Sequence, residues 1–164
     1  KGDDRFQYTS QATYTFDSSN NRVTTSYTVT DKALADSNAV DEDGNNMLDE
    51  NGNQVINYGL KHFAKEQAKQ TAHELIKRFS WLVERVTMDS SKTIPSAVTT
   101  YCANIRTDCA DIITAIDNAS DMTAFKALYQ DTYNYDSNGE ITSVNTVARV
   151  NRWSDDENVQ QYVR

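Results

Sequence analysis

Residues 60–86, LKHFAKEQAKQTAHELIKRFSWLVERV, decide the fold of this chain. Their apolar side chains recur every three or four residues, which is the spacing of one face of an α-helix. Phe63, Ile76 and Val83 widen the stripe, while lysines, arginines and glutamates occupy the opposite side. The pattern predicts one continuous helix of about 30 residues. The stripe consists of Leu60, Ala64, Ala68, Thr71, Leu75, Phe79, Leu82 and Val86.

A second helical stripe follows a short connection. Ile94-Pro95 precedes it, and proline is tolerated in the first turn of a helix. Because the connection is short, the two helices should pack antiparallel as a helical hairpin. The second stripe consists of Val98, Cys102, Ile105, Cys109, Ile112 and Ile116.

The segment before the helices has the alternation of β-strands. Residues 11–16 (QATYTF) and 22–30 (RVTTSYTVT) flank a polar turn, which predicts a β-hairpin. A two-stranded hairpin alone is marginal in water, so this one must pack on something else. Residues 41–45 (DEDGN) then recur as residues 49–53 (DENGN), with Asp, Asn and Gly where tight turns need them. We expect a hairpin or a pair of tight turns there.

The segment after the second helix repeats these themes. Ser120 or Asp121 could cap a third, short helix that ends near Tyr129. Residues 136–139 (DSNG) form a turn between strand candidates, and from Trp153 onward a polar tail should be extended or disordered until it meets a partner. The sequence thus predicts an α+β protein: a long antiparallel helical hairpin plus a short third helix, with N-terminal and C-terminal β-hairpins.

The chain length of 164 residues suits one domain divided into three parts. We expect an N-terminal β-hairpin and acidic-turn region at 1–57, a helical hairpin core at 58–132, and a C-terminal hairpin with an extended tail at 133–164. Only 38% of the residues are hydrophobic and the mean hydropathy is −0.72. That is low for a compact monomer, so either the body is slender or partner chains supply part of its burial.

Charge and hydropathy exclude several classes of partner. The formal net charge of −8 would repel nucleic acid, because affinity for phosphates comes mainly from Lys and Arg. No window approaches the roughly 20 apolar residues that span a bilayer, and no apolar segment of a signal peptide is recognisable. We therefore expect neither a nucleic-acid nor a membrane partner. Two cysteines do not make a disulfide framework.

The acidic turns are the best candidates for a metal site. Asp41-x-Asp43-x-Asn45 begins like a calcium loop, but an EF-hand then needs Gly at its sixth place and Glu at its twelfth. Those places hold Asn46 and Gly52. Solvated turns are the preferred interpretation, and calcium binding is the alternative that stays open.

Other constellations point to structure rather than chemistry. His62 and His73 share a helix face but lie about 16 Å apart along the axis, too far to bind one metal ion. Cys102 and Cys109 lie about 10 Å apart on the apolar stripe, too far for a disulfide. There is no nucleophile elbow and no glycine-rich phosphate loop. We predict no catalytic residues, no cofactor and no metal, and hence a protein that is not an enzyme.

Aromatic and cationic side chains are the candidates for an interface, since Trp, Tyr and Arg often anchor protein contacts. Trp81 and Arg85 are neighbours at i and i+4 on the first helix. The second interpretation, given equal weight, is that Trp81 closes the end of the helical core. Trp153, which follows Arg152, should contact another chain because its surroundings are so polar. The predicted interface residues are Tyr14, Tyr27, Trp81, Arg85, Arg106, Arg152 and Trp153.

Residues 75–116 resemble the helical C-terminal segment of bacteriophage tail-fibre assembly and tail-assembly-chaperone-like proteins, including those of marine and cyanobacterial phages. In those proteins two antiparallel helices share the pattern L…(D)W…R…(V/I)P…Y(R)…(L/I)R. Ser80 stands before Trp81 where the family has Asp, and Cys102 follows Tyr101 where it has Arg. What the resemblance implies is a phage tail context and no particular reaction. The matching residues are Leu75, Trp81, Arg85, Ile94-Pro95, Tyr101, Ile105-Arg106 and Ile116.

We therefore expect a virion structural protein of a phage tail, at a fibre, baseplate or adaptor position and made in the host cytoplasm. Its partners would be copies of itself and other phage structural proteins, such as tail or fibre subunits. The alternatives are an assembly chaperone absent from the mature virion, and a capsid decoration or receptor-binding module.

Overall fold

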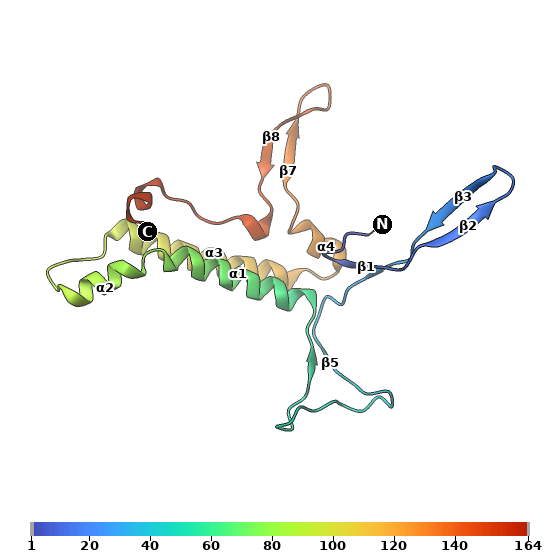
Figure 1. The fold of residues 1–164 in the computed structure, drawn as a ribbon. Helices are drawn as coiled ribbons and strands as arrows, with labels where there is room; N and C mark the ends of the chain where they lie inside the picture. Colours follow the sequence, from blue (N-terminus) through green and yellow to red (C-terminus); the bar gives the residue numbers. More distant parts are fainter. Residues whose placement is uncertain (1, 164) are drawn as a thin grey trace. The chain divides into compact units, whose positions relative to one another are not determined.

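The computed structural model describes residues 2–163, and the chain is mixed α+β with small antiparallel strand pairs towards both ends (Figure 1). Two compact units divide it between His62 and Phe63. The predicted fold class is confirmed at this level. The strand pairs of the first unit are β1 (Gln7–Thr9) with β4 (Val29–Asp31), β2 (Thr13–Asp17) with β3 (Arg22–Ser26), and β5 (Ser37–Asn38) with β6 (Ile56–Asn57).

The predicted N-terminal hairpin is the pair β2–β3. The Asp17 carboxylate accepts the backbone N–H groups of Ser19 and Asn20, and Asn21 takes a positive φ of 47° to close the turn. The predicted second strand is interrupted at Tyr27, after which the chain pairs with β1 instead. Strand alternation continues through this interruption, so periodicity alone does not reveal it.

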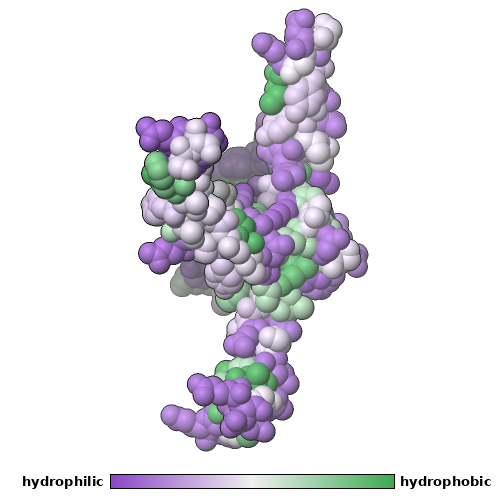
Figure 2. Space-filling view, turned by 90° about the vertical axis from the view of Figure 1, so that its right-hand side faces the viewer, coloured by the Kyte–Doolittle hydropathy of each residue, from purple (hydrophilic) through white to green (hydrophobic). Residues whose placement is uncertain are grey.

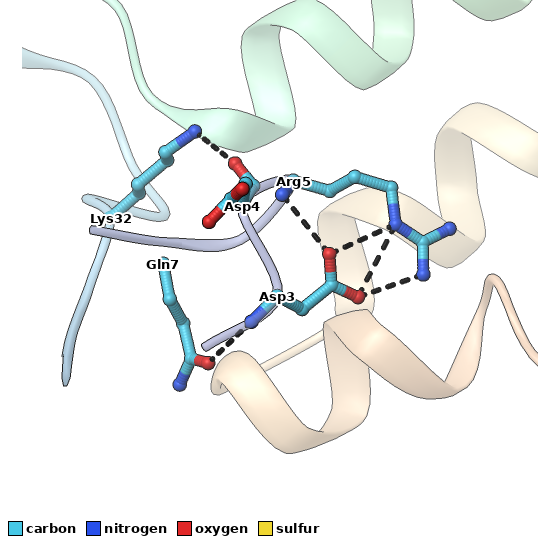
Figure 3. A network of polar contacts seen from close by, with 5 residues as sticks. All are labelled: Asp3, Asp4, Arg5, Gln7 and Lys32. Atoms are coloured by element: carbon cyan, nitrogen blue, oxygen red, sulfur yellow. Dashed lines mark hydrogen bonds and ion pairs between the residues drawn. The ribbon is translucent and has the colours of Figure 1, made fainter. Parts of the chain in front are cut away.

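Polar contacts fasten the start of the chain to β1 and to the segment after β4 (Figure 3). The Arg5 guanidinium donates to both carboxylate oxygens of Asp3, with distances of 2.8 to 3.3 Å. The Gln7 side chain accepts from the Asp3 amide and donates to Asp31 at 2.7 Å. Lys32 donates to the backbone oxygen of Asp4 at 2.6 Å. These bonds fasten the first residues of the chain to the short two-stranded sheet of β1 and β4.

Three backbone hydrogen bonds join the residues that flank the two acidic turns, and together they close a ring. Met47 donates to Ala39, Val55 donates to Met47, and Ala39 donates to Val55, each N–H to a carbonyl oxygen at 2.8 to 2.9 Å. These residues stand eight positions apart, so the duplication seen in the sequence continues into a third, shortened copy that begins at Val55. Gly44 and Gly52 adopt φ values of 83° and 82°, which glycine accepts without steric cost. The predicted pair of tight turns is confirmed.

The second unit contains most of the helical part of the chain. Among residues 2–163, no helix is long and apolar enough to cross a membrane. In chain order, the elements from the unit boundary onward are α1 (Leu60–Lys77), α2 (Ser80–Met88), α3 (Ser96–Asn118), α4 (Met122–Ala127), β7 (Thr132–Tyr135), β8 (Ile141–Thr146) and the 3-10 helices η1 (Arg149–Asn151) and η2 (Glu157–Tyr162).

The prediction of one continuous helix over this stretch is wrong, because the helix breaks between Lys77 and Ser80. Phe79 leaves helical geometry with φ −106° and ψ 3°, and its N–H donates to Ile76 in a tighter turn. Its ring lies edge-on to Tyr101 with 5.6 Å between the centroids. Since α1 and α2 both pack on α3, the apolar spacing continues across the break, and periodicity could not report it.

Helices α1 and α3 lie side by side and run in opposite directions (Figure 1). Lys65 near the start of α1 bonds Asp117 near the end of α3 at 2.9 Å, while Phe79 meets Tyr101 near the start of α3. Ile105 is fully buried in this core. The main cluster consists of Ala72, Phe79, Leu82, Val98, Tyr101, Ile105 and Val159.

The prediction that the polar tail from Trp153 onward is extended or disordered is wrong for residues 153–163, and Arg164 lies outside the described residues. Val159 of η2 is 1% exposed and belongs to the main core cluster. The Ser154 N–H donates to the Asp108 carboxylate of α3 at 2.6 Å. A few apolar side chains and polar contacts with distant residues are enough to fold this segment onto the helices.

Two smaller predictions are confirmed. Asp121 caps α4, since its carboxylate accepts the N–H of Ala124 at 2.8 Å. The turn at 136–139 joins β7 to β8, with Gly139 at φ 81°. The Asp136 carboxylate accepts the N–H groups of Asn138 and Glu140, so this turn repeats the chemistry of the acidic turns.

Candidate interaction surfaces

The β2–β3 ribbon has one apolar face and one polar face. Phe16 pairs with Val23 and Tyr14 pairs with Thr25, so these four side chains share a face. Tyr14, Phe16 and Val23 are 70%, 63% and 61% exposed. The other face carries threonine, serine and the charged ends of the strands. An aromatic face this exposed is unusual unless another surface covers it.

The β7–β8 ribbon has the same construction. Tyr133 pairs with Val144 and Tyr135 pairs with Ile141, and all four side chains are exposed. The irregularity in the register between Asn134 and Tyr135 lets two residues three apart on β8, Ile141 and Val144, both stand opposite tyrosines. In Figure 2 this ribbon stands at the top and is mostly pale, with green hydrophobic atoms among the hydrophilic ones. Both ribbons thus pair exposed aromatic residues with branched side chains: Tyr14 and Phe16 on β2–β3, and Tyr133 and Tyr135 on β7–β8.

A groove lies where the helix break faces α3. Its volume is about 400 Å³, and apolar side chains from α1, α2, α3 and the connections between them line it. His73, Lys77 and Arg106 stand among the lining residues, and no acidic residue does. We call it the basic-rimmed groove. Its apolar lining consists of Ile76, Phe79, Val83, Ile94 and Val98.

The predicted interface residues are divided between the two units, with Tyr14 and Tyr27 in the first and the others in the second. Tyr14 lies on the apolar face of β2–β3, and Tyr27 is exposed just beyond that ribbon. Arg106 lines the basic-rimmed groove and donates to the Cys102 carbonyl of its own helix at 3.3 Å. Arg152 is exposed and donates to the carbonyl of Val147 at 3.0 Å.

The two tryptophans are part of the core boundary. Trp81 is half-buried against the core cluster, and its indole N–H donates to the Tyr162 carbonyl at 2.9 Å. The alternative that Trp81 closes the end of the helical core therefore fits the structure, and Arg85 beside it is exposed on a shallow pocket that both residues line. Trp153 is also half-buried against the cluster. The argument that Trp153 lacks local partners is wrong, because the tail folds back.

The carboxylates of the acidic turns are occupied by their own loops. Asp41 accepts the N–H of Asn45, and Asp49 accepts that of Asn53, both at 2.8 Å. These backbone hydrogen bonds are the main reason why the pKa of each carboxyl is lowered from its ordinary value of 3.8. Across residues 2–163 no three His, Cys, Asp or Glu side chains gather as metal ligands would. The carboxylate oxygens of Asp41 and Asp49 thus accept hydrogen bonds that hold their own turns.

The remaining candidates have ordinary surroundings. Cys102 and Cys109 are free and half-buried, and burial raises the pKa of both thiols. His62 stacks on Tyr58 with 3.9 Å between the ring centroids, and its Nδ1 lies 3.7 Å from Asp36. His73 is exposed at the basic-rimmed groove.

Sequence reasoning missed most of these surfaces. Phe16 and Val23 alternate with polar residues and could have been assigned to an open face from the sequence. Ile141 and Val144 are three residues apart, and only the register shift brings both opposite tyrosines, which spacing alone does not predict. The sequence carries no signal for the basic-rimmed groove, because the groove arises from the helix break at Phe79, which the sequence did not predict. Comparisons with known protein families, with characterised proteins and with solved structures found no match to this chain.

Proposed function

We propose that this chain is a non-enzymatic structural protein of a bacteriophage tail, at a fibre, baseplate or adaptor position, that works through contacts with other protein chains. The observation that carries the protein-contact part is the pair of ribbons with uncovered apolar faces. The phage context comes from the sequence resemblance over residues 75–116.

The ribbons support a contact role in two ways. Fully burying a side chain the size of Phe16 or Tyr14 contributes about 1.5–3 kcal/mol, so a partner covering one face gains a useful anchor. In addition, every described strand belongs to a two-stranded sheet and has a free edge. A partner strand can therefore add to a ribbon through backbone hydrogen bonds while its side chains meet the apolar face.

The helical unit supplies the support. In the proposed arrangement α1 and α2 form one arm of a long antiparallel helical hairpin and α3 forms the other. The residues behind the resemblance are largely part of this core: Tyr101, Ile105 and Ile116 are buried and Trp81 is half-buried. Helix packing thus accounts for the sequence pattern shared with the phage proteins. The ribbons lie outside that pattern, and contacts particular to this chain would form there.

Mass spectrometry of purified, salt-washed particles of the phage that encodes the chain tests the virion assignment. A structural protein is retained in a fixed ratio to the tail subunits. An assembly chaperone is present in the infected cell and absent from the washed particle, and that result would sink the virion assignment. Recovery with heads that lack tails would favour a capsid decoration protein instead.

A ribbon variant tests the contact surface. Replacing Tyr14, Phe16 and Val23 together with serine should abolish incorporation into particles, because it removes the apolar face. The matched control replaces Thr13, Thr15 and Thr24 of the opposite face with serine and should be incorporated normally. Circular dichroism of both variants checks that the helical unit is intact. Equal incorporation of the two variants would show that the apolar face is not the contact.

A further inference from the structure

The basic-rimmed groove is a cationic site on an acidic protein. The chain has 24 acidic and 16 basic residues. Yet His73, Lys77 and Arg106 line this groove together with apolar side chains and without a carboxylate. A surface of this kind is complementary to a ligand that carries apolar side chains next to negative charge.

The cationic groups of the groove are available. Lys77 and Arg106 are exposed, and neither forms an ion pair with any residue from 2 to 163. The nearest acid along the same helix, Glu74, accepts a hydrogen bond from Gln70 at 2.8 Å. Among residues 2–163 the Arg106 guanidinium donates only to the Cys102 carbonyl of its own helix, which leaves most of its N–H groups for a partner.

The ring of tight turns in the first unit carries the complementary surface. Val40, Met47 and Leu48 are exposed there, with Leu48 at 60%. The side chains of Glu42 and Glu50 make no hydrogen bond or ion pair with residues 2–163. Figure 2 shows this part at the foot of the view, where green hydrophobic atoms are bordered by purple hydrophilic ones. We call residues 39–55 the acidic lobe.

The acidic lobe is organised before it meets any partner. Three backbone hydrogen bonds close its ring, and the Gln54 side-chain N–H group donates to the carbonyls of Ala39 and Val55 at 2.9 and 2.8 Å. Asp41 and Asp49 hold the two turns from inside. A preorganised surface loses little conformational entropy on binding, which favours its use as a ligand.

We infer that the basic-rimmed groove of one copy receives the acidic lobe of a second copy. Leu48 and Met47 would cover the apolar floor, while Glu42, Asp43 and Glu50 meet Lys77 and Arg106 at the rim. The two surfaces are different, so the contact is heterologous and repeats from copy to copy into a ring or a filament. This inference names one partner of the protein and rests on the proposed function only in that the chain works through protein contacts.

Sedimentation velocity of the full chain, from low to high micromolar concentration at low salt, tests the inference. The wild type should associate with rising concentration, and added salt should weaken the association. The groove variant K77E/R106E and the lobe variant D43K/E50K should each self-associate at least about tenfold more weakly, because attraction at the rim becomes repulsion. Mixing the two variants should restore association, since each then offers what the other lacks.

Two controls separate the contact from general charge effects. The variant K69E/K92E changes the net charge as much as the groove variant does, but it alters exposed lysines outside the groove, and it should associate like the wild type. Leu48→Ser should weaken association without any change of charge. Circular dichroism confirms that each variant is folded.

Several results would overturn the inference. A wild type that stays monomeric at every concentration would overturn the inference. This holds also if the acidic lobe is then found crosslinked to the groove of its own chain. The inference would also be overturned if K69E/K92E lost as much self-association as the groove variant. The same holds if mixing the groove variant with the lobe variant did not restore association. These outcomes are separate from the virion assignment: a monomeric protein that is nonetheless found in washed particles sinks the groove contact alone.

Discussion

The indole Nε1 of Trp81 donates a hydrogen bond of 2.9 Å to the backbone oxygen of Tyr162, joining the start of α2 to the end of η2. This bond explains why a polar segment near the end of the chain is ordered. Val159, one turn away in η2, is buried in the same core cluster. The segment is therefore part of the helical core, and the ribbons carry the uncovered apolar surface.

Replacing Trp81 with Phe should loosen η2. The substitution removes the N–H donor, and losing a hydrogen bond of this kind costs about 0.5–1.5 kcal/mol. The amides of residues 157–162 should exchange faster with solvent, as measured by hydrogen–deuterium exchange. Trp153→Phe is the matched control, because Trp153 is also half-buried but makes no such bond to η2. Equal acceleration in both variants would mean that ring size, and not this bond, holds the segment.

Replacing Ile105 with Ala should destabilise the helical core strongly. Ile105 is fully buried between α3 and the helices that face it, and truncations of this kind cost about 2–5 kcal/mol. Ile141→Ala on the β7–β8 ribbon makes the same chemical change at a side chain that is 59% exposed, and it should cost less than about 0.5 kcal/mol. Urea denaturation of the two variants measures both. Similar midpoints would refute the placement of Ile105 in the core.

How far the sequence predicts the fold depends on the range of the interaction involved. The helices and the turn at residues 136–139 follow from local spacing and from Asp and Gly at fixed offsets, so the sequence predicts them correctly. The break at Phe79 and the docking of η2 depend on contacts with Tyr101 and Trp81, which are distant in the sequence. No local pattern encodes such contacts, so sequence reasoning misses these two features.

The candidate surfaces are predictable only in part for the same reason. Composition singles out Tyr14 as a lone aromatic anchor, and the register then places Phe16 and Val23 beside it. For Trp153 the reasoning from composition fails, because a few contacts to α3 outweigh the polarity of its neighbours. The groove beside Arg106 depends on how two helices meet, and that geometry has no counterpart in residue spacing.

Gly59 should not tolerate a side chain, although its φ is ordinary. A Cβ at this position would lie 2.5 Å from the backbone carbon and oxygen of Ala35, and backbone atoms cannot move aside cheaply. Gly59→Ala should therefore unfold or displace the segment whose carbonyls at Ala33 and Leu34 accept the first N–H groups of α1. Chemical denaturation followed by circular dichroism measures the loss.

Gly44→Ala is the control for Gly59. Gly44 has a φ of 83°, but a Cβ at this position would meet no atom within 4 Å, so only backbone strain of about 1 kcal/mol is expected. The close approach at Gly59 should cost clearly more. If the two alanine variants were equally stable, the tight packing against Ala35 would be refuted.

Acid should release each acidic turn through the protonation of its own carboxylate, Asp41 or Asp49. The N–H group of Asn45 stabilises the ionised form of Asp41, which lowers its pKa below the ordinary value of 3.8. A group whose pKa is lower in the folded state stabilises that state fully above its unfolded pKa, and this contribution is lost as the pH falls through the folded value. NMR should therefore show the Asn45 amide proton shifting at a pH below the ordinary Asp value of about 4. In Asp41→Asn that shift should disappear, while the Asn53 amide, which reports on Asp49, should titrate as before. An Asn45 amide that still titrates in the variant would show that another group controls the turn.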